Sequence, residues 1–157
     1  MIMSTKKLAY AAAVAVIYIV VTLAAAPISF GLIQVRVSEA LTVLPALSPW
    51  TIWGLFIGCL ISNIYTGQIV DIVFGSIATL LAAGGTYFLR RRKWLLPLPP
   101  VVLNGVIVGG YLTALYGGVW YVNMATVALG EFISCYIIGL PLLSVIRKNK
   151  QLTEFLK

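Results

Sequence analysis

Six apolar runs, separated by short breakers, limit what this sequence can fold into. The runs cover residues 8–26, 32–47, 52–66, 69–89, 101–116 and 122–146. About 20 apolar residues are enough for a helix to cross the hydrocarbon core of a bilayer. Only 10% of the 157 residues are charged, whereas a soluble domain carries about 25%. Because a soluble chain of this length could not bury so much apolar surface, the bilayer must solvate most of it.

The basic residues indicate how the runs cross the membrane. They form three clusters at the ends of apolar runs: Lys6 with Lys7, Arg90 to Lys93, and Arg147 to Lys150. Cytoplasmic loops are enriched in Lys and Arg, and six crossings place all three clusters on that side. Five crossings would not place all three clusters on the same side. We therefore predict an all-α bundle of six transmembrane helices in the plasma membrane, a single domain over residues 1–157 with both termini cytoplasmic. The net charge of +7 sets orientation, so nucleic acid is not an expected partner.

Two runs fit this scheme less simply. The first follows Lys6 and Lys7 and ends in three alanines, as a signal peptide does, but its length favours a retained helix. The second run, 32–47, is the least hydrophobic and could be a re-entrant or tilted element. Small residues four positions apart predict close helix packing inside the bundle. These pairs are Gly54 with Gly58, Gly105 with Gly109, Ala9 with Ala13, and Ala11 with Ala15.

Four ionisable residues lie within or beside the apolar runs: Arg36, Glu39, Asp71 and Glu131. Each costs roughly 2.5–3.5 kcal/mol at the centre of a membrane helix, so they should face inward, pair or lie at the interface. The predicted topology places all four in the outer half of the membrane. Glu131 has no obvious partner nearby in the sequence, which makes it the strongest functional candidate.

Polar and aromatic residues are predicted to share this outer half and to form a pocket that opens to the outside. They are Gln34, Asn63, Tyr65, Gln68, Tyr111, Tyr116, Trp120, Tyr121 and Asn123. Structural explanations remain open for several members. Arg36 and Glu39 could neutralise each other, Asp71 could be an interfacial helix cap, and Tyr116, Trp120 and Tyr121 could belong to an interfacial aromatic belt.

The charges of the predicted pocket indicate the kind of solute it suits. Three carboxylates against one arginine give a formal charge of −2. Such an excess favours a cationic or donor-rich ligand, and aromatic rings suit a flat or cationic one. Histidine and CxxC motifs are absent, so zinc and histidine catalysis are excluded; no Walker A motif is present, so the chain hydrolyses no ATP. We expect no enzyme and no cofactor, and we interpret Cys59 and Cys135 as small apolar side chains.

Three segments resemble the QueT family. They read LAAAPISFG over 23–31, IQVRVSEALTVLP over 33–45, and DIVFGSIATLLAA over 71–83, followed by the basic cluster. The resemblance implies the substrate-binding S component of an energy-coupling factor (ECF) transporter for queuosine precursors. It would bind 7-aminomethyl-7-deazaguanine or a close relative from outside. It would then dock on one transmembrane coupling protein and two ATPase subunits, through Ala11 and Ala15 or through Ala9 and Ala13.

The implied ligand agrees with the charge of the pocket, since it is flat, rich in donors and cationic at its aminomethyl group. We hypothesise that Glu131 or Glu39 accepts hydrogen bonds from the guanine edge. A second carboxylate would hold the cation, and Arg36 would position Glu39. The alternatives are an S component for another small metabolite such as a vitamin, an ion-coupled secondary transporter using Glu131 and Asp71, and a structural scaffold.

Overall fold

The computed structural model describes residues 5–29, 35–149 and 153, and these residues form helices and turns with no strand. The elements are α1 (Thr5–Ala24), α2 (Ala26–Ser29), the 3₁₀ helix η1 (Val37–Ala46), α3 (Thr51–Thr66), the π turn η2 (Asp71–Gly75), α4 (Ser76–Phe88), the 3₁₀ turn η3 (Lys93–Leu95), α5 (Leu98–Tyr116), α6 (Trp120–Phe132), the π turn η4 (Ile133–Gly139) and α7 (Leu140–Lys148). The prediction of an all-α membrane protein is confirmed.

Among the described residues, four helical stretches are long and apolar enough to cross a membrane. They are Thr5–Ala24, Asp71–Phe88, Lys93–Tyr116 and Trp120–Lys148. Two shorter apolar helices, Val37–Ala46 and Thr51–Tyr65, correspond to the second and third runs of the sequence. A 3₁₀ helix rises about 2.0 Å per residue, so the ten residues of η1 span less than the roughly 30 Å of a hydrocarbon core. The count of six crossings therefore stays a prediction.

Glycine and proline lie at the starts and ends of the long helices, where the sequence predicts breaks. Gly67 closes α3 in the left-handed conformation, with a φ of 72°. Gly117 and Gly118, with φ of 75° and 90°, form the turn between α5 and α6. Pro99 lies in the first turn of α5, where the missing amide hydrogen is not needed. These turns make α3 with α4, and α5 with α6, antiparallel neighbours.

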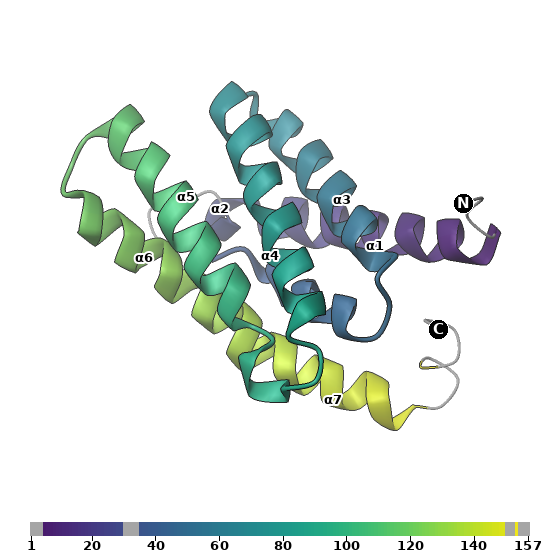
Figure 1. The fold of residues 1–157 in the computed structure, drawn as a ribbon. Helices are drawn as coiled ribbons and strands as arrows, with labels where there is room; N and C mark the ends of the chain where they lie inside the picture. The colour runs from purple at the N-terminus through teal and green to yellow at the C-terminus, as the bar shows by residue number, and fades with distance from the viewer. Residues whose placement is uncertain (1–4, 30–34, 150–152, 154–157) are drawn as a thin grey trace.

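The two ends of the bundle differ in charge. Figure 1 shows the start of α1 and the end of α7 at the right, and the turns after α3 and α5 at the upper left. Lys7, near the start of α1, lies 4.8 Å from the ring of Trp50, which directly precedes α3. Basic residues therefore gather at the end of the molecule opposite the two glycine turns, as the positive-inside pattern requires.

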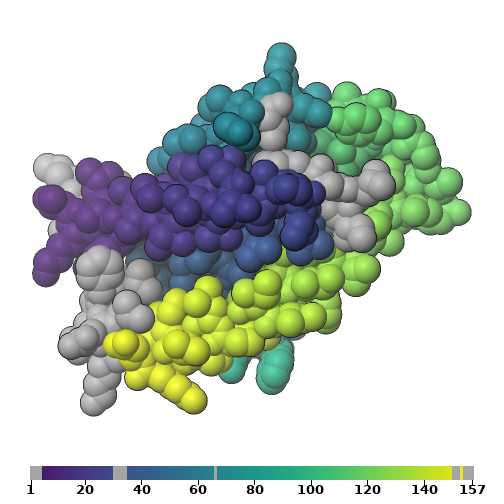
Figure 2. Space-filling view, turned by 180° about the vertical axis from the view of Figure 1, so that it is seen from behind, coloured from purple at the N-terminus to yellow at the C-terminus, as the bar shows by residue number. Residues whose placement is uncertain are grey.

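Glycine pairs provide the closest helix contacts. A Cβ added to Gly58 of α3 would stand 2.8 Å from the Cβ of Tyr18 of α1, and Gly54 lies against Ala11. A Cβ on Gly109 of α5 would stand 2.7 Å from the backbone nitrogen of Met124 of α6. The predicted packing role of both glycine pairs is confirmed. Figure 2 shows α1 lying lengthwise across the back of the molecule.

The 3₁₀ helix η1 is buried in the interior of the bundle. Its Val43 and Leu44 are at most 4% exposed and contribute to two hydrophobic clusters, with Tyr18 and Leu143 among their members. A Cβ on Gly139 of η4 would stand 3.0 Å from the Ala40 carbonyl oxygen, so η4 approaches η1 closely. The second apolar run thus forms a short core element that carries Glu39 into the centre.

Candidate functional site

The four ionisable residues of the apolar runs are all buried. Arg36 is 4% exposed, Glu39 0%, Asp71 5% and Glu131 2%. The prediction that they avoid lipid by facing inward is confirmed. They come from η1 with its preceding residue, from η2 and from α6, so three distant parts of the chain converge on one interior region.

Glu39 is anchored through one of its two carboxylate oxygens. Its Oε1 accepts hydrogen bonds from the hydroxyl of Tyr18 on α1 and, at 3.0 Å, from Thr79 Oγ1 on α4. Its Oε2 is buried and has no hydrogen-bond partner among the described residues. Both polar neighbours are side chains that the sequence prediction did not include. The carboxylate is therefore held in a fixed place with one acceptor atom unused.

Side-chain bonds fix η1 between α1 and η4. Thr22 Oγ1 donates to Ser38 Oγ at 2.6 Å, which ties the start of η1 to α1. The Glu39 carbonyl accepts from Thr42 Oγ1 at 2.6 Å and from Cys135 Sγ of η4 at 3.3 Å. A 3₁₀ helix has poorer internal hydrogen-bond geometry than an α-helix, so these outside contacts help to define its position.

Glu131 has a partner on both carboxylate oxygens. Asn104 Nδ2 of α5 donates to Oε1 at 2.8 Å, and the Cys135 thiol lies 3.6 Å from Oε2. Asn104 is itself 3% exposed, and its Oδ1 is buried without a partner among the residues that the structure describes. The Asn104 amide is thus held by its nitrogen and leaves its oxygen unused.

Asp71 and Tyr111 form a second group, nearer the glycine turns. The Tyr111 hydroxyl donates to Asp71 Oδ1, and Asn63 Nδ2 donates to the Asp71 carbonyl at 2.9 Å. The structure assigns Asp71 no capping hydrogen bond, since the residue at the cap of this π turn is Val70. Asp71 lies in the first turn of η2, where a carboxylate is favoured, but it makes no capping hydrogen bond and its side chain is buried.

Cys59 and Thr79 link the two groups. Thr79 Oγ1, which also bonds Glu39, lies 3.3 Å from Cys59 Sγ. Asn63 Nδ2 and Arg36 Nη1 approach the same sulfur at 3.4 and 3.9 Å. We call the connected set the buried polar cluster; it comprises Tyr18, Arg36, Glu39, Cys59, Asn63, Asp71, Thr79, Asn104, Tyr111, Glu131 and Cys135.

The buried polar cluster has an excess of acceptors. Arg36 lies within electrostatic range of Asp71, Glu39 and Glu131, so one cation faces three carboxylates. As ionised groups their formal sum is −2, and uncompensated buried charge is costly. The cluster therefore suits a cation or a solute with several N–H donors. Within the described part of the chain, no three His, Cys, Asp or Glu side chains are grouped to hold a metal ion.

Comparison with known proteins identifies the family. The profile described as QueT transporter matches residues 8–148, which is most of the chain and includes the whole buried polar cluster. The chain belongs to the QueT transporter family. The family is one of transporters rather than of enzymes, and the apolar helices make this chain a multi-pass protein of the plasma membrane.

One curated relative is the queuosine precursor transporter QueT of Lactococcus lactis subsp. cremoris, strain MG1363. It is 36% identical over 86 residues, which are 52% of this chain and 51% of the relative. The match thus spans about half the length of the relative. No solved structure matches this QueT-family chain.

Three predicted binding residues of this QueT-family chain lie apart from the buried polar cluster. Trp120 and Tyr121 are both 60% exposed and pack edge to face at 5.9 Å between ring centroids. Asn123 Nδ2 donates to Thr113 Oγ1 at 3.0 Å and to the Gly117 carbonyl at 3.2 Å. These contacts suit an aromatic belt and a turn that joins α5 to α6. Gln34 lies outside the described residues.

The two candidate docking stripes on α1 differ in exposure. Ala11 and Ala15 are 5% and 6% exposed because α3 covers them. Ala9 and Ala13 are exposed. Of the two predicted registers, only the second is open to a partner in this conformation of the QueT-family chain.

Sequence reasoning did not include five of the eleven residues of the cluster. Asn104 is the only amide of the apolar run 101–116, and that isolation is a signal that could have identified it. Tyr18 and Thr79 carry no such signal, because both residue types are common in membrane helices. Cys59 and Cys135 are free, as expected, and fully buried; Cys59 packs in a hydrophobic cluster, and both thiols also contact polar groups.

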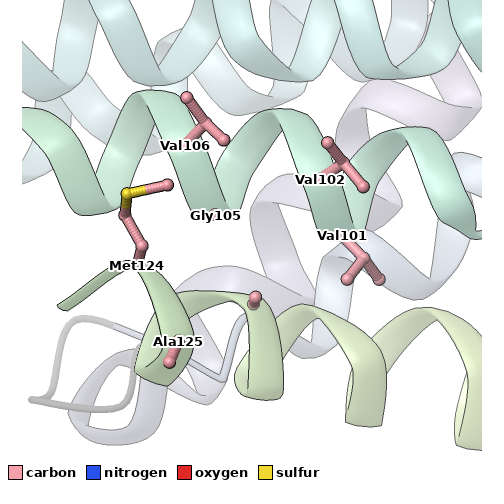
Figure 3. Close-up of a pocket in the computed structure, with 7 residues that line it drawn as sticks. Val101, Val102, Gly105, Val106, Met124 and Ala125 are labelled. Carbon is pink, nitrogen blue, oxygen red and sulfur yellow. The ribbon is translucent and has the colours of Figure 1, made fainter. Parts of the chain in front are cut away.

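An apolar groove between α5 and α6 is separate from the cluster. Figure 3 shows Val101, Val102, Gly105 and Val106 of α5 facing Met124 and Ala125 of α6. The groove encloses about 310 Å³ and, with Ala128, is lined only by apolar residues. It offers no side-chain hydrogen bond, and Val102 and Val106 are each 49% exposed. Lipid or another helix suits such a surface better than a polar solute does.

Proposed function

We propose that this QueT-family chain is the substrate-binding S component of an ECF importer for a queuosine precursor, 7-aminomethyl-7-deazaguanine or a close relative. The observation that carries the proposal is the buried polar cluster, with its three carboxylates and one arginine. A buried cluster of this composition inside a transporter is most simply explained as a ligand site. The name of the Lactococcus lactis relative supports the same solute.

The chemistry of this ligand complements the cluster. Its ring N–H, its 2-amino group and its aminomethyl ammonium are donors, and the last carries a positive charge. Glu39 Oε2 and Asn104 Oδ1 are acceptors without partners in the described residues. Bonds between an ammonium and a carboxylate are charge-assisted and roughly twice as strong as neutral ones. The cluster should therefore bind a cationic, donor-rich solute more tightly than a neutral vitamin.

We also propose six membrane crossings with both termini in the cytoplasm. The basic clusters gather at one end of the bundle, and the turns at Gly67 and Gly117 lie at the other. In this arrangement η1 and α3 are short crossings, tolerated because neighbouring helices surround them. Asp71 and Tyr111 then lie on the outer side of Glu39, along a polar route from the exterior.

We further propose that this chain docks on an ECF coupling protein with two ATPase subunits. The chain has no Walker A motif, so in this proposal a partner hydrolyses the ATP. The exposed Ala9 and Ala13 of α1 offer a flat stripe on which another helix could pack closely. They lie near Lys7, at the basic end of the bundle.

Ligand titration of the purified full-length protein tests this function. Calorimetry with 7-aminomethyl-7-deazaguanine should show saturable binding, with guanine and thiamine as controls. Glu39→Gln should weaken binding by roughly 10–100-fold, since it removes one charge-assisted contact. Folded wild-type protein that binds thiamine, or no deazaguanine, would contradict the proposed ligand.

A second candidate, an ion-coupled secondary transporter, is favoured by the full burial of Glu131 and Asp71. Uptake by vesicles that contain only this chain, driven by a proton gradient, would establish it. The ECF proposal requires that such vesicles show no uptake until the coupling protein and ATPase subunits are added.

A further inference from the structure

Asn104 is held so that its oxygen must face away from Glu131. The amide occupies the middle of α5 and is 3% exposed. Its Nδ2 donates to Glu131 Oε1 at 2.8 Å. An ionised carboxylate accepts and does not donate, and the structure has the Asn104 nitrogen as the end of the amide that faces Glu131. The remaining Oδ1 is buried and, among the described residues, has no hydrogen-bond partner.

Both carboxylate oxygens of Glu131 have a polar neighbour, although the single Cys135 S–H also lies 3.3 Å from the Glu39 carbonyl. Glu131 Oε1 is used by Asn104, and Glu131 Oε2 is approached by the Cys135 thiol at 3.6 Å. Glu39 differs, because its Oε1 has two donors while its Oε2 has none in the described part of the chain. Buried acceptors without partners are rare in folded proteins, since each one loses its hydration without compensation. Glu39 Oε2 and Asn104 Oδ1 are therefore candidates for the atoms that a bound solute would satisfy.

Contacts place the two unused acceptors in one region. Cys135 Sγ contacts both the Glu39 carbonyl, at 3.3 Å, and Glu131 Oε2. Glu39 and Glu131 also lie close enough to interact electrostatically. The Asn104 amide, bonded to Glu131, therefore belongs to the same interior region as Glu39.

We propose that Glu39 and Asn104 contact the ligand directly, while Glu131 is a positioning residue that aims the Asn104 oxygen. This inference rests on the proposed function and assigns a different group of the ligand to each contacting residue. The anionic Glu39 Oε2 takes the aminomethyl ammonium, because a carboxylate gains most from a cation. The neutral Asn104 oxygen takes the 2-amino group of the base. Asn104 thereby selects for a guanine-type edge, a role that the sequence prediction gave to the two glutamates.

Calorimetry with three ligands, on the full-length wild-type protein and its variants, tests this division. The ligands are 7-aminomethyl-7-deazaguanine, its analogue without the 2-amino group, and 7-methyl-7-deazaguanine, which lacks the ammonium. The proteins are wild type, Asn104→Ala, Glu131→Gln and Glu39→Gln. Thermal unfolding in the same detergent establishes that each variant is folded.

Each substitution should affect one ligand group. Asn104→Ala should lower the affinity for the aminomethyl ligand by about tenfold and leave the affinity for the analogue without the 2-amino group unchanged. Glu39→Gln should lower the affinity for the aminomethyl ligand by at least about tenfold and leave the affinity for the 7-methyl ligand unchanged. Glu131→Gln should stay within about threefold of wild type for all ligands, because a glutamine oxygen still accepts from Asn104. Glu131→Leu, the matched variant without that acceptor, should reproduce the pattern of Asn104→Ala.

The outcomes separate this inference from the proposed function. Wild-type protein that binds none of the three ligands overturns both. Wild-type binding combined with a tenfold loss in Glu131→Gln, specific to the ammonium ligands, makes Glu131 the direct contact and overturns the division alone. Equal losses for all ligands in Asn104→Ala assign Asn104 a structural role and also overturn it. If Asn104→Ala does not fold, the ligand affinities of Glu131→Gln still decide whether Glu131 contacts the ligand directly.

Discussion

Gly58 of α3 lies so close to Tyr18 of α1 that a Cβ on the glycine would stand 2.8 Å from the Cβ of the tyrosine. The same tyrosine donates its hydroxyl proton to Glu39. The packing of two helices therefore sets the position of a carboxylate in a third element. Any residue larger than glycine at position 58 must move Tyr18, and Glu39 loses a donor when it does.

Gly58→Ala is predicted to weaken both the fold and the site. Overpacking a tight contact costs about 1–3 kcal/mol. We expect a lower melting temperature in detergent and weaker binding of 7-aminomethyl-7-deazaguanine, measured by calorimetry. Gly84→Ala is the matched control, because a Cβ at Gly84 of α4 would meet nothing within 4 Å. It should be neutral or stabilise by up to about 1 kcal/mol, since alanine favours helix. Equal effects of both variants would contradict this account.

Tyr111→Phe is predicted to destabilise the protein through Asp71. The tyrosine hydroxyl donates to the Asp71 carboxylate, which is 5% exposed. Leaving that acceptor without its donor costs about 1–3 kcal/mol, read as a loss in the free energy of unfolding. The double variant with Asp71→Asn should lose less than the sum of the two single variants, because both remove one interaction. Strict additivity would show that the two side chains are energetically independent.

Replacing both Ala9 and Ala13 by leucine is predicted to prevent docking and to leave ligand binding intact. The two residues are exposed on α1, so larger side chains there can be accommodated in the free protein but would obstruct close approach by another helix. Co-purification with the coupling protein measures docking, and calorimetry measures binding. Ala125→Leu on α6, also exposed, controls for added apolar surface. Unchanged co-purification would exclude this stripe as the docking surface.

Single cysteines at the two ends of the bundle test the proposed topology. The native Cys59 and Cys135 are fully buried, so a membrane-impermeant maleimide should leave them unlabelled. Gln68→Cys should react in intact cells, because position 68 lies in the exposed turn after α3. Arg91→Cys should react only after the membrane is permeabilised. Labelling of Arg91→Cys in intact cells would reverse or reject the proposed orientation.

The sequence predicted where helices lie far better than it predicted what they contact. Helix limits follow apolar runs and breakers, so α1, α3 and α5 begin and end within a few residues of expectation. Burial of the ionisable residues followed from the cost of exposing them to lipid. The pairing of helices did not follow, because small-residue spacing identifies a packing surface without naming its partner.

The site shows the same division. Glu39 and Glu131 stood out because charge is conspicuous in an apolar run, whereas the partners of Glu39, Tyr18 and Thr79, are ordinary residues in membrane helices. The partner of Glu131, Asn104, is a neutral amide and stood out less. Trp120 and Tyr121 were grouped with the pocket by depth alone. Depth gives the level of a residue in the membrane, but which side of the helix faces inward depends on packing.

The π turn η4 changes the rotational phase of the long helix from Trp120 to Lys148. Each residue turns an α-helix by about 100°, and a π turn accommodates one residue more than an α turn does. Glu131 before η4 and Leu143 after it are both buried, although a continuous α-helix would turn them to different angles. Deleting one residue within Ile133–Gly139 would therefore act at a distance. It would preserve helix and hydrophobicity, yet rotate every side chain beyond the turn out of alignment with the core.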